Sequence, residues 1–405
     1  MSASHRTLLH GGRVFDGTGS RPQPADVVLE GARVADVGLG LDGDEAIDVT
    51  GKTVLPGLID CHVHVTASGV DVMQRLTRPF SYQFYEAARN LEATLATGIT
   101  TVRDAGGADL GIQQAVADGL VAGPRLLLAV NIIGQTGGHT DGWFPSGFEV
   151  PLSLPHPGRP AAIADGVDEL RKVVRSLLRA GADVIKICTT GGVLSPRDEP
   201  GHTQFSQEEV DVVVAEAAAA GRVVMAHAQG APGIKNAVRA GVRSIEHGIH
   251  LDDEAIDLML AHGTWLVPTL VAPRAVVRAA AAGAQLPPAV VDKAREVAQV
   301  HLASVRAAVA AGVPVAMGTD SGVGPHGQNL DELPLLAECG LTPEQVLVSA
   351  TGGAAALCGL HDRTGRLAPG LAADLVVVAG DALDLDGLRE RVLQVWQAGR
   401  QVAAA

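Results

Sequence analysis

The feature that most constrains this fold is the regular alternation of short apolar runs with stretches of helical spacing through the middle of the chain. We expect strands at about 54–64, 99–104, 126–133, 183–188, 223–228, 243–247, 264–269 and 314–320. Four stretches between them carry apolar residues at helical spacing and end near a glycine: SYQFYEAARNLEATLAT, DGVDELRKVVRSLLRAG, SQEEVDVVVAEAAAAG and DDEAIDLMLAHG. Alternating strands and helices form parallel sheets, and eight such units suit a barrel. We therefore predict an α/β fold with a (β/α)8 TIM barrel over residues 53–364, including one or two long helices at about 284–312.

The two ends of the chain have a different texture. Segments such as ADVVLEGARVADVG near the start and GLAADLVVVAG near the end are brief Val-rich runs broken by Gly, Pro and Asp, as in small sheets with tight turns. We predict that residues 1–52 and 365–405 together form one small β-sandwich-like domain.

Composition supports a buried parallel sheet and excludes several partners. The 405 residues are 47% apolar but only 3% aromatic, so the core must consist mainly of Ala, Val, Leu and Ile. The formal charge of −14 and the lack of a basic run argue against nucleic acid and anionic membrane surfaces. No stretch reaches the roughly 18 apolar residues of a membrane span, and we expect a cytoplasmic protein. The four cysteines form no CxxC pair, which indicates reduced thiols rather than disulfides or a thiolate zinc site.

The strongest local motif is DCHVHV at the end of the first expected strand. Alternate side chains of a strand share one face, so His62 and His64 can bind the same metal ion. Alone, the motif could also be two unrelated histidines.

Lys186 lies in the apolar run ADVIKIC, where a charged amine is costly to bury without a partner. It is either paired with a carboxylate or chemically altered. Burial and nearby cations favour the neutral amine, which can add carbon dioxide to form a carbamate with two oxygens, enough to bridge two metal ions.

Three further residues end apolar runs. His227 in VVMAHAQG, His247 in RSIEHGIH and Asp320 in VAMGTDSG would lie at the carboxyl ends of strands, where barrel active sites lie. Singly, each histidine could be a core residue and the aspartate a helix N-cap. Together with the first histidine pair and the lysine, they fit the ends of strands one, four, five, six and eight of one barrel.

This combination resembles the amidohydrolase superfamily, in its subtype with a carboxylated lysine between two metals. The resemblance covers nearly the whole chain, through VLPGLIDCHVH, GITTVRDAGG, IKICTTGGV, IEHG, MGTDSG and TGRLAPGLAADLVVV. It implies that two divalent ions, with zinc preferred, are held by six residues: His62, His64 and Asp320 at one metal, His227 and His247 at the other, and carboxylated Lys186 between them.

Within the superfamily, GQTGGHTDGWFP and IKICTTGGVLSPRDEP are most similar to the group of Xaa-Pro dipeptidases, acyl-amino-acid and dipeptide hydrolases and ochratoxin-type amidases. The family pattern makes His139 a residue that faces the substrate and polarises or steadies the scissile carbonyl; otherwise it is a loop histidine within its own turn. Several of those dipeptidases carry Tyr or His where this chain has Gln229, so recognition of a substrate carboxylate at that place is in doubt.

The resemblance implies hydrolysis of an amide of a small molecule, such as a dipeptide or an N-acyl amino acid, by a metal-bridging hydroxide. Asp320 would act as general base and then general acid, and a homo-oligomer is expected. The alternatives are a cyclic amide or lactone hydrolase, an imidazolonepropionase-like enzyme, which the lysine disfavours, and a non-catalytic scaffold barrel, which the complete ligand set disfavours. Weaker candidates for substrate contact lie on nearby loops or strand ends: Trp143, Phe144, Cys188, Arg197, Asp198, His202 and His250.

Overall fold

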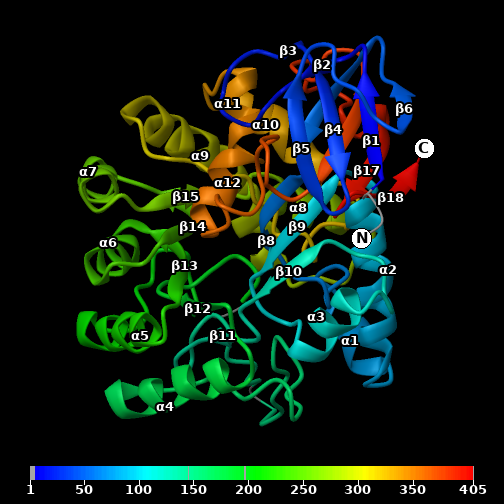
Figure 1. Cartoon of the computed structure of the whole chain (residues 1–405). Helices are drawn as coiled ribbons and strands as arrows, with labels where there is room; N and C mark the ends of the chain where they lie inside the picture. Colours follow the sequence, from blue (N-terminus) through cyan, green and yellow to red (C-terminus); the bar gives the residue numbers. More distant parts are fainter. Residues whose placement is uncertain (1–4, 145, 196–197, 405) are drawn as a thin grey trace.

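A computed structural model of the chain describes residues 5–144, 146–195 and 198–404. Its centre is an α/β arrangement of parallel strands with helices packed outside them (Figure 1). One sheet has the order β10-β9-β8 and another the order β11-β12-β13-β14-β15. These strands are β8 (Leu58–Val63), β9 (Ile99–Asp104), β10 (Arg125–Leu128), β11 (Ile132–Ile133), β12 (Val184–Cys188), β13 (Val223–Gly230), β14 (Ser244–His250) and β15 (Trp265–Val267).

The eighth expected strand connects the outer edges of these two sheets through backbone hydrogen bonds. On one side the amide of Ala316 donates to the carbonyl of Leu266 in β15 (3.0 Å). On the other, the amide of Cys61 in β8 donates to the carbonyl of Met317 (2.9 Å). The segment around 314–321 therefore lies between the first and the seventh strand.

Two expected strands are divided in the structure. The run at 54–64 becomes β7 (Lys52–Pro56), which pairs with β16 (Leu375–Ala379), and then β8. The run at 126–133 becomes β10 and β11, and Val130 between them has a φ of 67°. A β-branched residue in this left-handed region interrupts regular strand pairing.

The helices follow the amphipathic stretches closely. Four of those predicted from the sequence are α2 (Tyr82–Ala96), α4 (Gly166–Arg179), α5 (Gln207–Ala219) and α7 (Asp253–His262). A capping box of Ser206 and Glu209 starts α5, which satisfies amide groups that the helix itself leaves unpaired. The predicted Ala-rich stretch is a single helix, α9 (Pro288–Ala311), ended by Gly312 at a φ of 91°. The remaining helices are α1 (Val72–Thr77), α3 (Leu110–Ala117), α6 (Ala231–Ala240), α8 (Val271–Ala281), α10 (Glu332–Glu338), α11 (Pro343–Ser349) and α12 (Gly352–Leu357), with 3-10 turns η1 (Asn329–Asp331) and η2 (Arg389–Arg391).

The two ends of the chain form two further sheets that share one core, at the top of Figure 1. A four-stranded sheet has the order β5-β4-β1-β6, and a six-stranded sheet has the order β18-β17-β16-β7-β2-β3. Buried side chains from both ends, among them Leu9, Val27, Leu375 and Trp396, pack in that core. The strands are β1 (Arg6–His10), β2 (Arg13–Val14), β3 (Gln23–Pro24), β4 (Asp26–Glu30), β5 (Arg33–Gly38), β6 (Glu45–Asp48), β17 (Val392–Gln397) and β18 (Arg400–Ala404).

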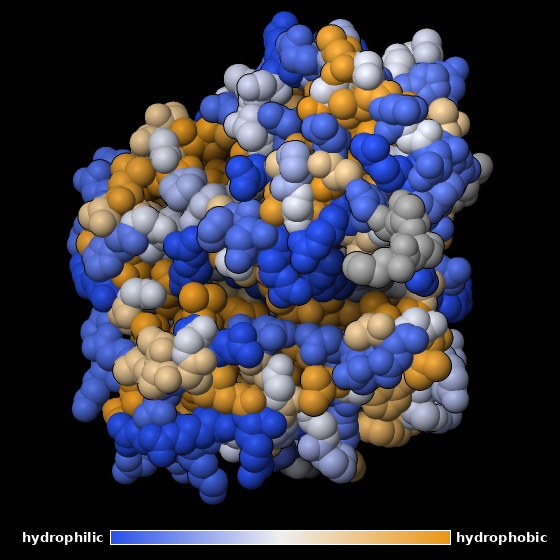
Figure 2. Space-filling view, viewed as in Figure 1, coloured by the Kyte–Doolittle hydropathy of each residue, from blue (hydrophilic) through white to orange (hydrophobic). Residues whose placement is uncertain are grey.

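Hydrophilic residues cover much of the face seen in Figure 2, with apolar residues showing between them. Within the described part of the chain, none of the helices combines the length and the apolar run that crossing a bilayer requires.

Candidate active site

The first two candidate ligands lie at the carboxyl end of β8 and are oriented by hydrogen-bond acceptors at their Nδ1 atoms. Nδ1 of His62 donates to Oε2 of Glu246 (2.7 Å), and Nδ1 of His64 donates to the carbonyl of Gly106 (2.7 Å). Since a carboxylate and a carbonyl only accept, both Nδ1 atoms carry the proton in the neutral rings. The Nε2 atoms are left with lone pairs that face the same carboxylate, Asp320.

Asp320 adds a carboxylate beside the Nε2 atoms of His62 and His64. Its Oδ1 lies 3.5 Å from Nε2 of His62 and 3.2 Å from Nε2 of His64. Burial opposes ionisation of Asp320, but the two histidines more than offset it and hold its pKa well below the usual range. Burial likewise lowers the pKa of His64, but Asp320 reverses the effect and leaves it raised. A carboxylate between two imidazole nitrogens requires a cation, either a proton or a metal ion.

Two of the candidate ligands have strained backbones. Asp320 has a φ of 57° and His247 a φ of 74°, and side chains other than glycine occupy this region at a cost of about 1–3 kcal/mol each. Thr269, at a φ of 55°, bonds Nδ1 of His247 through its hydroxyl (2.7 Å). Such strain persists only where the surroundings enforce it, and it is concentrated at functional sites.

His227 extends the cluster from β13. Its ring centroid lies 4.7 Å from that of His247, while the rings of His62 and His247 are 5.1 Å apart. Nε2 of His227 donates to the carbonyl of Gly191 (3.1 Å), which leaves Nδ1 as its free lone pair. Burial lowers the pKa of His227 and of His247 well below the ordinary value, so both rings are neutral, the form that binds metals.

Lys186 lies in the middle of β12, between Ile132 of β11 and Met225 of β13. Its side chain is 2% exposed, and its Nζ is one of the buried polar atoms that have no hydrogen-bond partner among the described residues. Burial lowers the pKa of this amine. Pairing with a carboxylate, the ordinary alternative for a buried lysine, is not seen at Lys186 within the described chain.

The buried ion pair that supports His62 at its Nδ1 atom was not predicted from the sequence. Glu246 in β14 and Arg103 in β9 are both buried and form an ion pair of 2.9 Å. Burial would raise the pKa of Glu246, but Arg103 and His62 outweigh it and lower the pKa to about 2. A carboxylate that orients a metal-binding histidine is a common outer partner of such sites. The sequence signal for Glu246 was its place in the IEHG motif, immediately before the candidate ligand His247.

The structure brings all six predicted metal ligands to one cavity, which also contains His139. Among the described residues, His62, His247 and Asp320 form a group whose ligand atoms all lie within 4.8 Å of one another and could hold a metal ion. The grouping joins His247 to the first site, whereas the sequence assigned it with His227 to the second.

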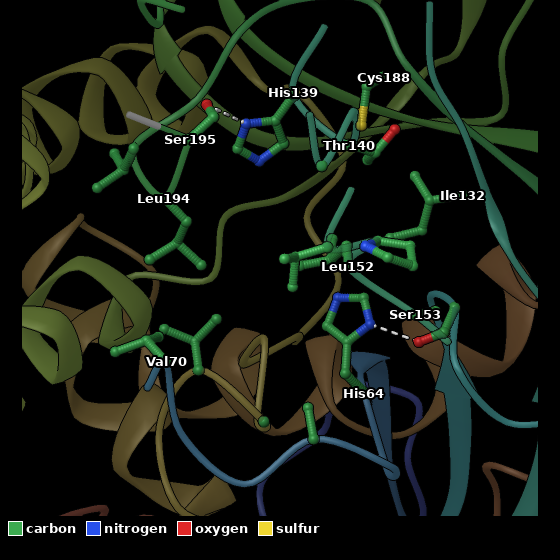
Figure 3. Close-up of a pocket in the computed structure, with 18 of the residues that line it drawn as sticks. His64, Val70, Ile132, His139, Thr140, Leu152, Ser153, Cys188, Leu194 and Ser195 are labelled. Carbon is green, nitrogen blue, oxygen red and sulfur yellow. Dashed lines mark hydrogen bonds between the residues drawn. The ribbon is translucent and has the colours of Figure 1, made fainter. Parts of the chain in front are cut away.

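The cavity has a volume of about 1140 Å³, and Figure 3 shows part of its lining. Apolar side chains from several loops form much of the wall, among them Val70, Leu152 and Leu194. Trp143 and Phe144, candidates for substrate contact from the sequence, do line it.

The other loop candidates divide between the cavity and the surface. Cys188, Asp198 and Gln229 line the cavity. His202 and His250 are exposed and are not among its lining residues. Arg197 lies outside the described residues.

Comparison with known proteins identifies the family. Residues 53–402 match the model of the amidohydrolase family. Ochratoxinase of Aspergillus niger is 33% identical over 97% of this chain and 86% of its own length, and its crystal structure superposes with a TM-score of 0.87, covering 100% of this chain and 96% of that one at 31% identity. An Xaa-Pro dipeptidase solved with bound methionine is 35% identical, with a TM-score of 0.90 over 99% of this chain and 100% of that one.

A more distant match concerns one of the alternatives. Imidazolonepropionase of Rhizorhabdus wittichii is 30% identical over 83% of this chain and 82% of its own length.

The family model matches most of the chain, and two relatives cleave amides. Together with the cluster of histidines and a carboxylate, these matches lead to one conclusion: this chain belongs to the amidohydrolase family and is a hydrolase of amide bonds.

Proposed function

We propose that the protein hydrolyses a peptide-like amide of a small molecule, such as a dipeptide or an N-acyl amino acid, at a site that holds two divalent metal ions. The observation that carries this proposal is the amine of Lys186, which is buried with no hydrogen-bond partner among the described residues and lines one cavity with four histidines and Asp320. A neutral amine there can add carbon dioxide and release a proton. The resulting carbamate gives the site an anionic bridge that the unmodified chain lacks.

The donor set fits such a centre. We propose that His62, His64 and Asp320 hold one ion, that His227 and His247 hold the other, and that carboxylated Lys186 lies between them. The ring of His247 lies beside that of His62, so the two sets of ligands adjoin. Nitrogen and oxygen ligands favour zinc and accept manganese, cobalt or iron. When bound, the ions would supply hydroxide near neutral pH and polarise the substrate carbonyl.

The chain's own residues would direct the reaction. Asp320, ionised and directed at the centre of the cluster, would take the proton of the attacking water and deliver it to the leaving amine. His139 would face the scissile carbonyl from the other side of the cavity. The apolar wall would exclude water and hold a bulky group of the substrate. Gln229, whose Oε1 is buried with no partner in the part of the chain that the structure describes, would contact a polar group of the leaving portion.

The barrel fold is part of this proposal. We infer that the eight parallel segments close into one (β/α)8 barrel, because the segment around 314–321 bonds to both β15 and β8. Between the two sheets, the amide of Asp183, immediately before β12, donates to the carbonyl of Leu128 at the end of β10 (2.7 Å). The small β domain from residues 1–52 and 365–405, the cytoplasmic location and the homo-oligomer stay predictions.

Metal content and substrate cleavage test the proposal together. Protein purified without chelator should contain about two divalent ions per chain by plasma emission spectroscopy and should release amino acids from a panel of dipeptides and N-acyl amino acids. One ion with hydrolysis of an imidazolone would favour the imidazolonepropionase-like alternative. No metal after supplementation and no cleavage would contradict the proposal and favour the scaffold.

A further inference from the structure

His139 is held on both faces of its ring. On one side the ring of His227 is stacked on it, with centroids 4.4 Å apart and an interplanar angle of 18°. On the other side lies the backbone of Gly192, where an added Cβ would come within 2.2 Å of Cε1 of His139. The loop therefore needs glycine at 192 for the histidine ring to lie where it does.

The edge of the same ring is fixed by two polar side chains of the loop after β12. Nδ1 of His139 lies 2.8 Å from Oγ of Ser195 (Figure 3), and Oγ of Ser195 donates in turn to the carboxylate of Asp198. The carbonyl of Gly192 is a more distant acceptor for that hydroxyl (3.4 Å). Because the hydroxyl has one proton and gives it to the carboxylate, it can only accept from His139. Nδ1 must therefore carry a hydrogen, and Nε2 is the ring atom that remains for the cavity.

Asp198 is built to stay ionised in this role. Burial raises its pKa, but His139 and Ser195 outweigh burial and lower the pKa to about 2. Its oxygens also accept from Nε2 of Gln204 (3.0 Å) and from the amide of Gly192 (3.3 Å). The carboxylate thus joins the histidine, the serine and the loop backbone in one network.

A helix that is distant in sequence, α9, holds the loop in place. Lys293 of α9 is 8% exposed, and its Nζ donates to the carbonyls of Gly192 (2.9 Å), Ser195 (2.7 Å) and Asp198 (2.7 Å). Three carbonyls satisfy all three N–H donors of an ammonium group. The ammonium group therefore holds the loop against α9 at Gly192, Ser195 and Asp198. Lys293 itself does not line the cavity.

We propose that Ser195 and Asp198 are positioning residues for His139 and that Lys293 holds their loop in place. The pair fixes the ring with Nδ1 protonated and Nε2 directed to the substrate, as an acid and a hydroxyl orient a histidine in other hydrolytic sites. The inference rests on the proposed function, because it gives His139 a contact with the substrate. It adds three residues, on a loop and a remote helix, on which that contact depends.

A double-mutant cycle between Ser195 and His139 tests this assignment. Ser195→Ala should lower kcat by about 10- to 100-fold, the usual effect of removing an orienting partner, with metal content and Tm unchanged. In the His139→Ala background the same substitution should have no further effect, because there is no ring to orient. Ser195→Thr, which keeps the hydroxyl, should restore most of kcat. Ser176→Ala, which removes a half-buried serine of α4 that does not line the cavity, is the matched control.

Two outcomes would overturn the proposal: an unchanged kcat in Ser195→Ala, or an equal loss whether or not His139 is present. Lys293→Met should lower kcat in the same way, and Asp198→Asn, which keeps the shape of the side chain, provides a second probe if the lysine variant fails to fold. Wild-type protein that cleaves no amide would instead contradict the proposed function, so the two failures are distinguishable.

Discussion

Replacing Lys186 by methionine should separate metal binding from folding stability, because the structure predicts opposite effects on the two. The buried Nζ has no hydrogen-bond partner among the described residues, and leaving such a group unsatisfied costs about 1–3 kcal/mol. Methionine has a similar length and no polar group. Chelator-treated Lys186→Met should therefore be more stable than chelator-treated wild type by about 1–3 kcal/mol.

This gain can be measured as a small shift in melting temperature. With an unfolding entropy of about 2 cal/mol/K per residue, a chain of this length should gain about 1–4 °C in Tm. Scanning calorimetry of both chelator-treated proteins gives the shift. Lys172→Met, on the exposed face of α4, is the control for replacing a lysine by methionine.

The same variant should lose function. Without the carbamate, metal content should fall from about two ions per chain, and kcat/KM should fall about 10³-fold, equivalent to roughly 4 kcal/mol. Small carboxylic acids should partly restore activity in Lys186→Ala, because they can occupy the space of the carbamate. A Lys186→Met protein with two metal ions and full activity would refute the bridging role, and a chelator-treated variant less stable than wild type would refute the argument from the unpaired amine.

Three further predictions concern residues around the site and the core. Thr269→Ala removes the hydroxyl that orients His247 and should weaken metal binding about 10- to 100-fold, measured by titration of the chelator-treated protein; unchanged affinity would show that the bond is dispensable. Glu246→Gln leaves a buried guanidinium unpaired and His62 without its anionic partner, so the free energy of unfolding in urea should fall by about 3–5 kcal/mol, and a loss below 1 kcal/mol would contradict this. Burial raises the pKa of Glu332 well above its ordinary value of 4.5, so the folded protein retains a proton that the unfolded chain releases. The free energy of unfolding should therefore fall as pH rises above 4.5, and Glu332→Gln should flatten that dependence in urea unfolding at several pH values.

The sequence by itself predicted most of the secondary-structure elements and the candidate site residues, because both predictions depend on local order. Strand alternation places His62 and His64 on one face whatever the rest of the chain does. Helical periodicity with caps predicted α5 and α7 to within a residue or two. A lysine in an apolar run indicated an unusual environment at Lys186 before any neighbour was known.

The divided strands show where local pattern was insufficient. The segment 54–64 is predicted as one strand, yet the structure assigns β7 to one sheet and β8 to another. Gly57, between them, lies so close to Thr100 that a Cβ would come within 2.1 Å of its hydroxyl. A change of partner is decided by contacts with distant strands, and single-sequence periodicity contains no information about them.

Only the tertiary structure decided how the site residues are supported. Glu246 orients His62 across 184 positions of sequence, and Lys293 holds the loop of Ser195 from a helix 98 residues away. Residue type and spacing identify groups able to bind a metal or move a proton. Their protonation, their orientation and the absence of a partner for a buried amine depend on burial and on neighbours that only the folded chain brings together, because electrostatic and hydrogen-bond energies are set by distances in space rather than in sequence.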